Sequence, residues 1–287
     1  MWLIIKPMMR TLLGCLLAAF VAGFVMSGTE AKPLDVGETP AQVQTSIHAQ
    51  VGDGELDGID QTNWDGETTF DVNYTTKAGE AHGFTVADDG TVLSVVVELS
   101  DTPAAVQEAI RTRAAGWSLD GINKNLADTQ VTYEADVSKG GQAKTFTVDA
   151  EGELVCADVT IAAMPAAAQT TVTSRVSGGI AQSISENIDA DGNTFDVVAM
   201  DKDGGRNAFS VGMDGRLLSV EVSLASIPPG ARKAIEAKIG GGKILHLNKS
   251  LVEKKDNVLP YGVEGRKDGK PFNFSVGPEG RFLGMDD

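Results

Sequence analysis

The strongest constraint in this sequence is a seven-residue phrase that occurs four times. Its copies are FTVADDG (84–90), FTVDAEG (146–152), FSVGMDG (209–215) and FSVGPEG (274–280). Four prolines precede the copies at matching positions, with separations of 63, 62 and 63 residues. These are Pro40, Pro103, Pro165 and Pro228. A fixed period of this kind predicts that the chain is built from four copies of one supersecondary unit.

The segment after each proline predicts a short amphipathic helix. Apolar residues stand three, seven and eleven positions after each proline, so they form one stripe along a helix. The four sets are Val43, Ile47 and Val51; Val106, Ile110 and Ala114; Ala168, Val172 and Val176; and Ala231, Ile235 and Ile239. The proline suits the first helical turn, and Thr39 and Thr102 are the expected N-caps.

Alternating patterns after each helix predict β-strands. An aromatic residue opens one strand in every copy, at Phe70, Tyr133, Phe195 and Tyr261. The intervening polar positions (Thr69, Asp71 and Asn73; Thr132, Glu134 and Asp136) are expected to be solvated. The repeated phrase then forms a strand whose Phe and Val face inward and whose Asp/Glu-Gly ending makes a hairpin turn.

The predicted fold class is therefore α+β, with four tandem repeats of one short helix plus a four-stranded antiparallel sheet. The predicted repeats span residues 39–101, 102–163, 164–226 and 227–287. A unit of this size is marginally stable alone, and open sheet edges favour pairing. We therefore expect neighbouring repeats to pack against one another.

The first 31 residues read as a signal peptide. Lys6 and Arg10 precede an apolar run at 11–26, and small residues follow up to Ala31. This pattern predicts export to the periplasm or the extracellular space, with no membrane association after cleavage. Two alternatives stay open: an uncleaved membrane anchor formed by 11–26, or lipidation at Cys15, although the apolar run continues past that residue.

The repeated unit resembles the PepSY-like repeats of secreted bacterial proteins. The resemblance rests on the proline-initiated helix, the aromatic-x-Val strand, the Lys-x-Gly turn, the Phe-x-Val strand and the Asp-Gly turn, and it covers residues 39–287. It implies a fold similar to that of beta-lactamase inhibitor protein and an exported, non-enzymatic binding role, with enzyme inhibition as one form. That inhibitor has two copies of the unit, whereas this chain has four.

The sequence contains no catalytic or metal-binding constellation that we can identify. The three histidines, His48, His82 and His246, fall at unrelated repeat positions, and no GxSxG motif is present. DADGNT (189–194) alternates acidic and amide side chains as calcium loops do, but it lacks the glycine and glutamate that an EF-hand requires. We therefore expect no enzyme activity, no cofactor and no metal.

Charge narrows the class of partner. The net charge of −16 disfavours nucleic acids, because their phosphates would repel the chain. Residues 39–101 carry 12 acidic and one basic residue, whereas residues 227–287 carry 11 basic and eight acidic residues. This difference suggests salt-dependent self-association between the ends of two chains.

Two tryptophans are candidate contacts for a partner. Trp64 and Trp117 do not recur in the other repeats, and tryptophan is enriched among residues that dominate protein interfaces. Local packing is the alternative explanation for both. The sequence thus predicts an exported protein-binding module, which includes inhibition of a protease or another enzyme. A periplasmic small-ligand or calcium-binding module and a structural envelope protein are the alternatives.

Overall fold

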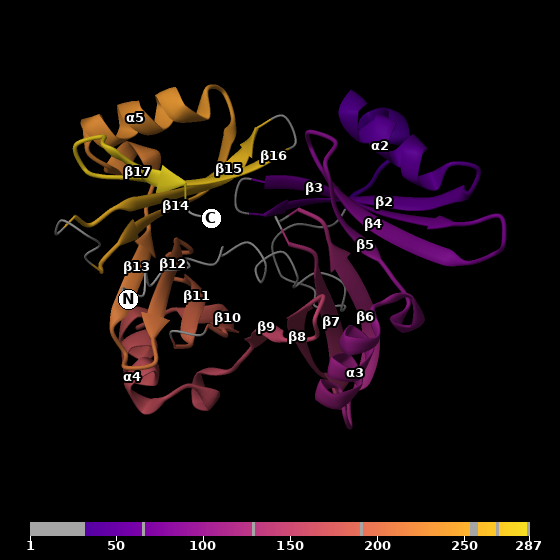
Figure 1. The fold of residues 1–287 in the computed structure, drawn as a ribbon, viewed down its shortest axis with the longest axis horizontal. Helices are drawn as coiled ribbons and strands as arrows, with labels where there is room; N and C mark the ends of the chain where they lie inside the picture. The colour runs from indigo at the N-terminus through magenta and orange to yellow at the C-terminus, as the bar shows by residue number, and fades with distance from the viewer. Residues whose placement is uncertain are drawn as a thin grey trace, which may run out of the picture. The chain divides into compact units, whose positions relative to one another are not determined.

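The computed structural model describes residues 32–64, 67–127, 130–189, 192–252, 258–267 and 270–285. The predicted signal peptide (1–31) lies outside these residues. The described chain divides into two compact units, which we call the N-terminal unit (32–158) and the C-terminal unit (159–285). Figure 1 shows the helices and strands of both units.

Each unit repeats one order of elements twice. The N-terminal unit contains β1 (Lys32–Pro33), η1 (Val36–Glu38), α2 (Ala41–Val51), β2 (Glu55–Trp64), β3 (Glu67–Thr75), β4 (Ala81–Ala87), β5 (Val92–Val96), η2 (Leu99–Asp101), α3 (Ala104–Arg113), β6 (Ser118–Asn125), β7 (Thr132–Lys139), β8 (Gln142–Asp149) and β9 (Leu154–Asp158). The C-terminal unit contains η3 (Ile161–Ala163), α4 (Ala166–Arg175), β10 (Ile180–Asn187), β11 (Thr194–Met200), β12 (Arg206–Gly212), β13 (Leu217–Glu221), η4 (Leu224–Ser226), α5 (Pro229–Ile239), β14 (Lys243–Ser250), β15 (Tyr261–Lys267), β16 (Lys270–Val276) and β17 (Phe282–Met285).

The prediction of a separate four-stranded sheet in each repeat is wrong. In the N-terminal unit β5 pairs with β6, which begins the next repeat, with Ser94 opposite Asn125. In the C-terminal unit β13 pairs with β14 in the same way, with Ser219 opposite Ser250. Within each unit the pairings form one continuous antiparallel sheet, which runs from β1 to β9 in the N-terminal unit and from β10 to β17 in the C-terminal unit. The last strand of a repeat would otherwise leave its backbone donors and acceptors unpaired, and the next repeat supplies their partners.

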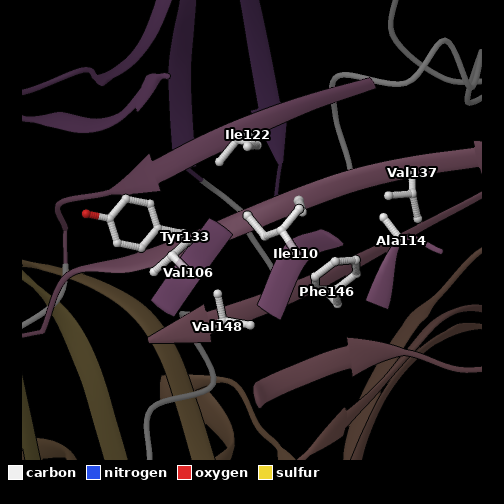
Figure 2. Close-up of a cluster of buried hydrophobic side chains, with 9 residues drawn as sticks. Val106, Ile110, Ala114, Ile122, Tyr133, Val137, Phe146 and Val148 are labelled. Carbon is white, nitrogen blue, oxygen red and sulfur yellow. The ribbon is translucent and has the colours of Figure 1, made fainter. Parts of the chain in front are cut away.

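Each repeat keeps its own hydrophobic core between its helix and its strands. In the second repeat Val106 and Ile110 of α3, with Ala114 at its C-cap, pack on Tyr133 and Phe146 of the sheet (Figure 2). The other three repeats have matching clusters under α2, α4 and α5. The first two residues of every predicted helical stripe are 0–1% exposed. The helix predictions are therefore confirmed, together with the inward direction of the repeated Phe and Val.

The glycine of the repeated phrase is required by two constraints at once. Gly90, Gly152, Gly215 and Gly280 all have φ between +80° and +87°, which L side chains rarely adopt. A Cβ on Gly152 would also lie 2.6 Å from the backbone oxygen of Ala105, in the first turn of α3, and the other three glycines meet the first turn of their own helices in the same way. The turn therefore packs directly on the start of the helix.

The prediction that Thr39 and Thr102 cap the helices is wrong. The N-cap residues are Pro40 and Pro103, with no hydrogen bond from their side chains. The Thr39 hydroxyl instead donates to Val36 O at 2.8 Å, and the Thr102 hydroxyl donates to Leu99 O at 2.9 Å. Both threonines thus close a short 3-10 turn that precedes each helix and that the sequence patterns did not reveal.

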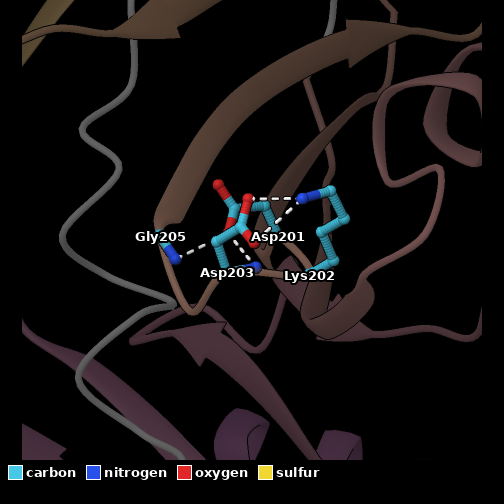
Figure 3. Close-up of polar contacts among 4 residues, drawn as sticks. All are labelled: Asp201, Lys202, Asp203 and Gly205. Atoms are coloured by element: carbon cyan, nitrogen blue, oxygen red, sulfur yellow. Dashed lines mark hydrogen bonds and ion pairs between the residues drawn. The ribbon is translucent and has the colours of Figure 1, made fainter.

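The turn between β11 and β12 is held by one aspartate. Asp201 Oδ1 accepts hydrogen bonds from the backbone N–H groups of Gly205 at 2.7 Å and Asp203 at 2.8 Å (Figure 3). Lys202 forms a salt bridge with Asp203 in the same turn. The backbone hydrogen bonds, above all the one from Gly205, lower the pKa of Asp201.

A search of the described residues for membrane-spanning helices found none of sufficient length and apolar character.

Candidate functional site

The face of the sheet that lies opposite the helices carries a recurring pair of polar residues. An acidic residue follows the aromatic residue of one strand, and it lies in register with the hydroxyl residue of the repeated phrase on the next strand. Register partners in an antiparallel sheet share one face. The pairs are Asp71 with Thr85, Glu134 with Thr147, and Asp196 with Ser210, whereas the fourth repeat has Gly262 opposite Ser275.

Two of these pairs are hydrogen bonded. Thr85 Oγ1 donates to Asp71 Oδ1 at 2.6 Å, and the Ser210 hydroxyl donates to Asp196, which also accepts from the Asn187 amide. Burial raises the pKa of both aspartates, because removal from water disfavours the charged form. The hydrogen bonds from the hydroxyl groups oppose that effect.

The second repeat adds a further carboxylate to this face. Glu134 and Asp136 lie two residues apart on β7, so both point away from α3. Burial raises the pKa of Glu134 well above its usual range, and the nearby charges of Asp136 and Asp158 raise it further. Burial also raises the pKa of Asp136, and a hydrogen bond from the Thr145 hydroxyl at 2.7 Å opposes that rise.

The prediction that these outward positions are solvated is wrong for the three of the second repeat. Glu134 is 2% exposed and Asp136 is 4% exposed, and Thr132 is also buried. Asp71 and Thr69 are partly buried, and Asn73 alone among the six is exposed. Alternation along a strand predicts which side chains share a face, but it does not predict whether that face is open to water.

The helix-free face of the N-terminal unit is acidic. Its carboxylates include Asp60, Asp71, Glu134, Asp136 and Asp158, and we call these five the acidic face. Asp60 lies in register with Asp71 and raises its pKa. Among the described residues of β6 to β9, no position on this face carries a lysine or an arginine.

The helix-free face of the C-terminal unit has a mixed charge. Arg206 Nη1 forms a salt bridge with Glu221 Oε2, and His246 Nδ1 lies 3.5 Å from Glu221 Oε1. Glu264 and Arg266 are buried on β15. The helix-free face of the C-terminal unit thus carries both charges, whereas the described residues of β6 to β9 carry acidic groups without a lysine or an arginine on theirs.

The two predicted partner contacts lie at different places, and neither is tested as a contact. Trp117 follows α3, is partly buried, and packs against the core of the second repeat. Lys144 Nζ lies 4.3 Å from the centre of its ring, which is a cation–π contact. Trp64 is the last residue of β2, where its backbone lies opposite Glu67. Its side chain is not among the parts that the structure describes. The two tryptophans remain predicted contacts.

The three histidines lie on three different elements, in agreement with their unrelated repeat positions. His48 lies in α2, His82 stacks on Tyr74 in the N-terminal unit, and His246 lies on β14. Within the described ranges, no group of three or more His, Cys, Asp or Glu side chains has an arrangement that could hold a metal ion. The calcium-like stretch 189–194 lies partly outside those ranges, and the amide of Asn193 donates to Glu186 at 2.7 Å.

Sequence reasoning did not identify the acid–hydroxyl pairs as a site. A signal was available: an acidic residue stands directly after the aromatic residue in three of the four repeats, and Thr or Ser follows Phe in all four. The patterns placed both on outward-facing positions. Only the strand register shows that the two residues are partners.

Comparison with known proteins gives structural similarity alone. No family model matches the chain, and no curated protein matches it. Similar solved structures include a BLIP-like protein from Bacteroides fragilis (19% identity, 42% of this chain and 84% of that chain, TM-score 0.31). Another is a DUF2874 family protein from Bacteroides ovatus (16% identity, 40% of this chain and 84% of that chain, TM-score 0.31).

A third similar structure comes from Bacteroides thetaiotaomicron (19% identity, 45% of this chain and 96% of that chain, TM-score 0.28). That protein is described as a calcium-regulated periplasmic protein. Each of these structures corresponds to less than half of this chain. The PepSY-like resemblance remains a prediction.

Proposed function

We propose that this chain is an exported, non-enzymatic binding protein that holds a protein partner on the helix-free faces of its sheet. Inhibition of a protease or another enzyme is the specific form that we propose. Export to the periplasm or the extracellular space follows from the signal-peptide pattern at 1–31.

One observation supports the proposal above the others: ionisable side chains are buried on the sheet face that lies opposite the helices of their own unit. Burial of Glu134 and Asp136 and partial burial of Asp196 cost free energy, which hydrogen bonds from neutral hydroxyl and amide groups offset only in part. The fold itself does not need an acid at this position, because the fourth repeat has Gly262 there. A role in binding gives these residues a function that packing does not.

A capture experiment with matched variants tests the proposal. Residues 32–287 are immobilised and exposed to the exported proteins of the source organism, and retained proteins are identified by mass spectrometry. A second column carries Glu134→Gln with Asp196→Asn, which alters one acid of the helix-free face in each unit. A control column carries Glu108→Gln with Glu236→Gln, which alters two exposed acids on α3 and α5.

A partner retained by the wild type and the control, but lost from the face variant, is the expected result. If that partner is an enzyme, its activity in the presence of the chain decides whether the chain inhibits it. Equal retention on all three columns would place binding elsewhere. Calcium-dependent melting, or fractionation of the chain with membranes, would instead support one of the two alternative functions.

A further inference from the structure

We propose that Glu134 and Asp136 on the acidic face bind the guanidinium group of an arginine side chain of the protein partner. This inference rests on the proposed function, since it names the chemistry by which one unit recognises that partner. It assigns the recognition to the second repeat of the N-terminal unit.

The strand register gathers the groups of this site on three neighbouring strands. Glu134 of β7 lies opposite Asn123 of β6 and Thr147 of β8. Asp136 lies opposite Thr145 of β8. The Thr147 side chain therefore shares its face with both carboxylates.

Two oxygen atoms of this group have unused capacity to accept hydrogen bonds. Asp136 Oδ1 accepts from Thr145, but Asp136 Oδ2 has no hydrogen-bond partner among the residues that the structure describes. Thr147 Oγ1 also has no hydrogen-bond partner among those residues, and Thr147 is only 1% exposed. Buried polar atoms without a partner are costly, so a ligand that donates to both would be favoured.

The charge of Glu134 and Asp136 favours a cation as the ligand. The nearby charge of Asp136 raises the pKa of Glu134 beyond the effect of burial. Among the described residues of β6 to β9, this face carries no lysine or arginine beside these two carboxyl groups. A cation from outside the sheet would stabilise the ionised carboxylates, which burial alone disfavours.

A guanidinium group fits these requirements better than other cations. It carries five N–H donors in a planar fork, has no acceptor, and stays charged at every relevant pH. Its fork can reach Asp136 and Thr147 together, whereas an ammonium group donates from a single point. A metal ion fits poorly, since the described residues hold no group of three suitable ligands.

The burial of the site predicts slow association. Glu134, Asp136 and Thr147 are all at most 4% exposed in this conformation. The arginine side chain therefore binds a minor conformation in which these atoms are uncovered. We expect an association rate constant below the usual protein–protein range of about 10⁵–10⁷ M⁻¹s⁻¹.

Binding of a labelled hexa-arginine peptide to residues 32–287, measured by fluorescence anisotropy at constant salt, tests this inference. The site variant is Glu134→Gln with Asp136→Asn. The control variant, Glu108→Gln with Glu151→Gln, replaces the same number of acids at exposed positions. A third variant, Thr147→Val, removes only the unpartnered hydroxyl. A hexa-lysine peptide of equal charge serves as the comparison ligand.

We expect the site variant to weaken hexa-arginine binding by about tenfold or more, and the control by less than about twofold. Thr147→Val should reduce the preference for arginine over lysine. Equal losses in the site and control variants would overturn the inference, because they would show only general attraction to an acidic chain. So would equal binding of the two peptides to the wild type.

Capture of the natural partner separates this inference from the proposed function. If that partner is lost from the Glu134→Gln, Asp196→Asn column while hexa-arginine binding is unaffected by the site variant, the arginine site is wrong and the binding face stands. If no partner depends on the face, the proposed function fails even where the peptide binds.

Discussion

At the residue scale, each position of the repeated phrase has its own physical reason. Phe146 and Val148 fill the core under α3, and the intervening Thr147 points to the helix-free face. Gly152 closes the turn and lies against the first turn of the helix. The phrase is repeated because each repeat must pack a strand, a turn and a helix start in the same way.

The close approach of Gly152 to α3 can be measured with a matched pair of variants. Gly152→Ala and Gly79→Ala both force alanine to φ +83° in a turn, but only the Cβ at 152 meets backbone atoms. We expect Gly79→Ala to cost about 1–2 kcal/mol of unfolding free energy. Gly152→Ala should cost about 1–3 kcal/mol more, from overpacking. Urea denaturation measures both, and equal costs would contradict the contact.

The buried Glu134 carboxyl predicts a characteristic dependence of stability on pH. Its pKa is raised in the folded state, so its contribution to stability is fully present below the unfolded pKa and is lost as the pH rises through the folded pKa. Glu134→Gln removes this titration and keeps a polar side chain beside Asn123.

We therefore expect Glu134→Gln to gain stability relative to the wild type as the pH rises from about 4 toward neutrality. Denaturation midpoints across this range measure the difference. Glu108→Gln, on the exposed side of α3, is the control and should show no such trend. A pH-independent difference for Glu134→Gln would mean that the carboxyl is not shielded as described.

At the element scale, each helix covers its own part of the sheet through a short stripe. The stripe is visible in the sequence because apolar residues at helical spacing are a local signal. The start of the helix was less predictable: proline takes the N-cap position, and the Gln107 side chain donates to Thr102 O at 2.9 Å. That contact depends on a 3-10 turn, which has no strong composition signal.

Removal of one buried helix residue tests how much the stripe stabilises the fold. Ile110 is 0% exposed in the core of the second repeat (Figure 2). Ile110→Ala should lower the unfolding free energy by about 2–5 kcal/mol, because it removes buried methyl groups and leaves a cavity. Thr112→Ala, on the exposed side of the same helix, should change it by less than about 0.5 kcal/mol. Similar effects of the two changes would contradict the packing.

At the scale of the whole molecule, neighbouring repeats of one unit are connected by strand pairing as well as by the polypeptide chain. The β5–β6 and β13–β14 ladders carry the sheet across the predicted boundaries at 101/102 and 226/227. The repeat boundaries in the sequence are therefore not boundaries of separate sheets.

Two fragments test this continuity. Residues 32–158 contain β2 to β9 with both helices, and we expect them to unfold cooperatively. Residues 32–101 leave β5 without β6 and bury too little surface for a stable fold. Thermal circular dichroism should show a sharp transition only for the longer fragment. An equally sharp and high transition for residues 32–101 would indicate independent repeats.

The charge difference between the first and fourth repeats gives a prediction for the intact chain. We propose that residues 39–101, with 12 acidic residues, attract residues 227–287 of another copy, which carry 11 basic residues. Sedimentation at about 20 mM salt should then show association that disappears at about 500 mM, where the Debye length is shorter than about 8 Å. A monomer at both salt concentrations would contradict this.

The sequence by itself determined the helices, the strands and the division of each strand into two faces. Those features follow from local periodicity and from turn residues such as Gly90 and Gly152. Both are signals that a short stretch of sequence carries by itself. Only the tertiary structure decided that β5 pairs with β6, because backbone hydrogen bonds carry no side-chain signature. It also decided that Glu134 and Asp136 are buried, since burial depends on what lies across the sheet and not on the alternation along one strand.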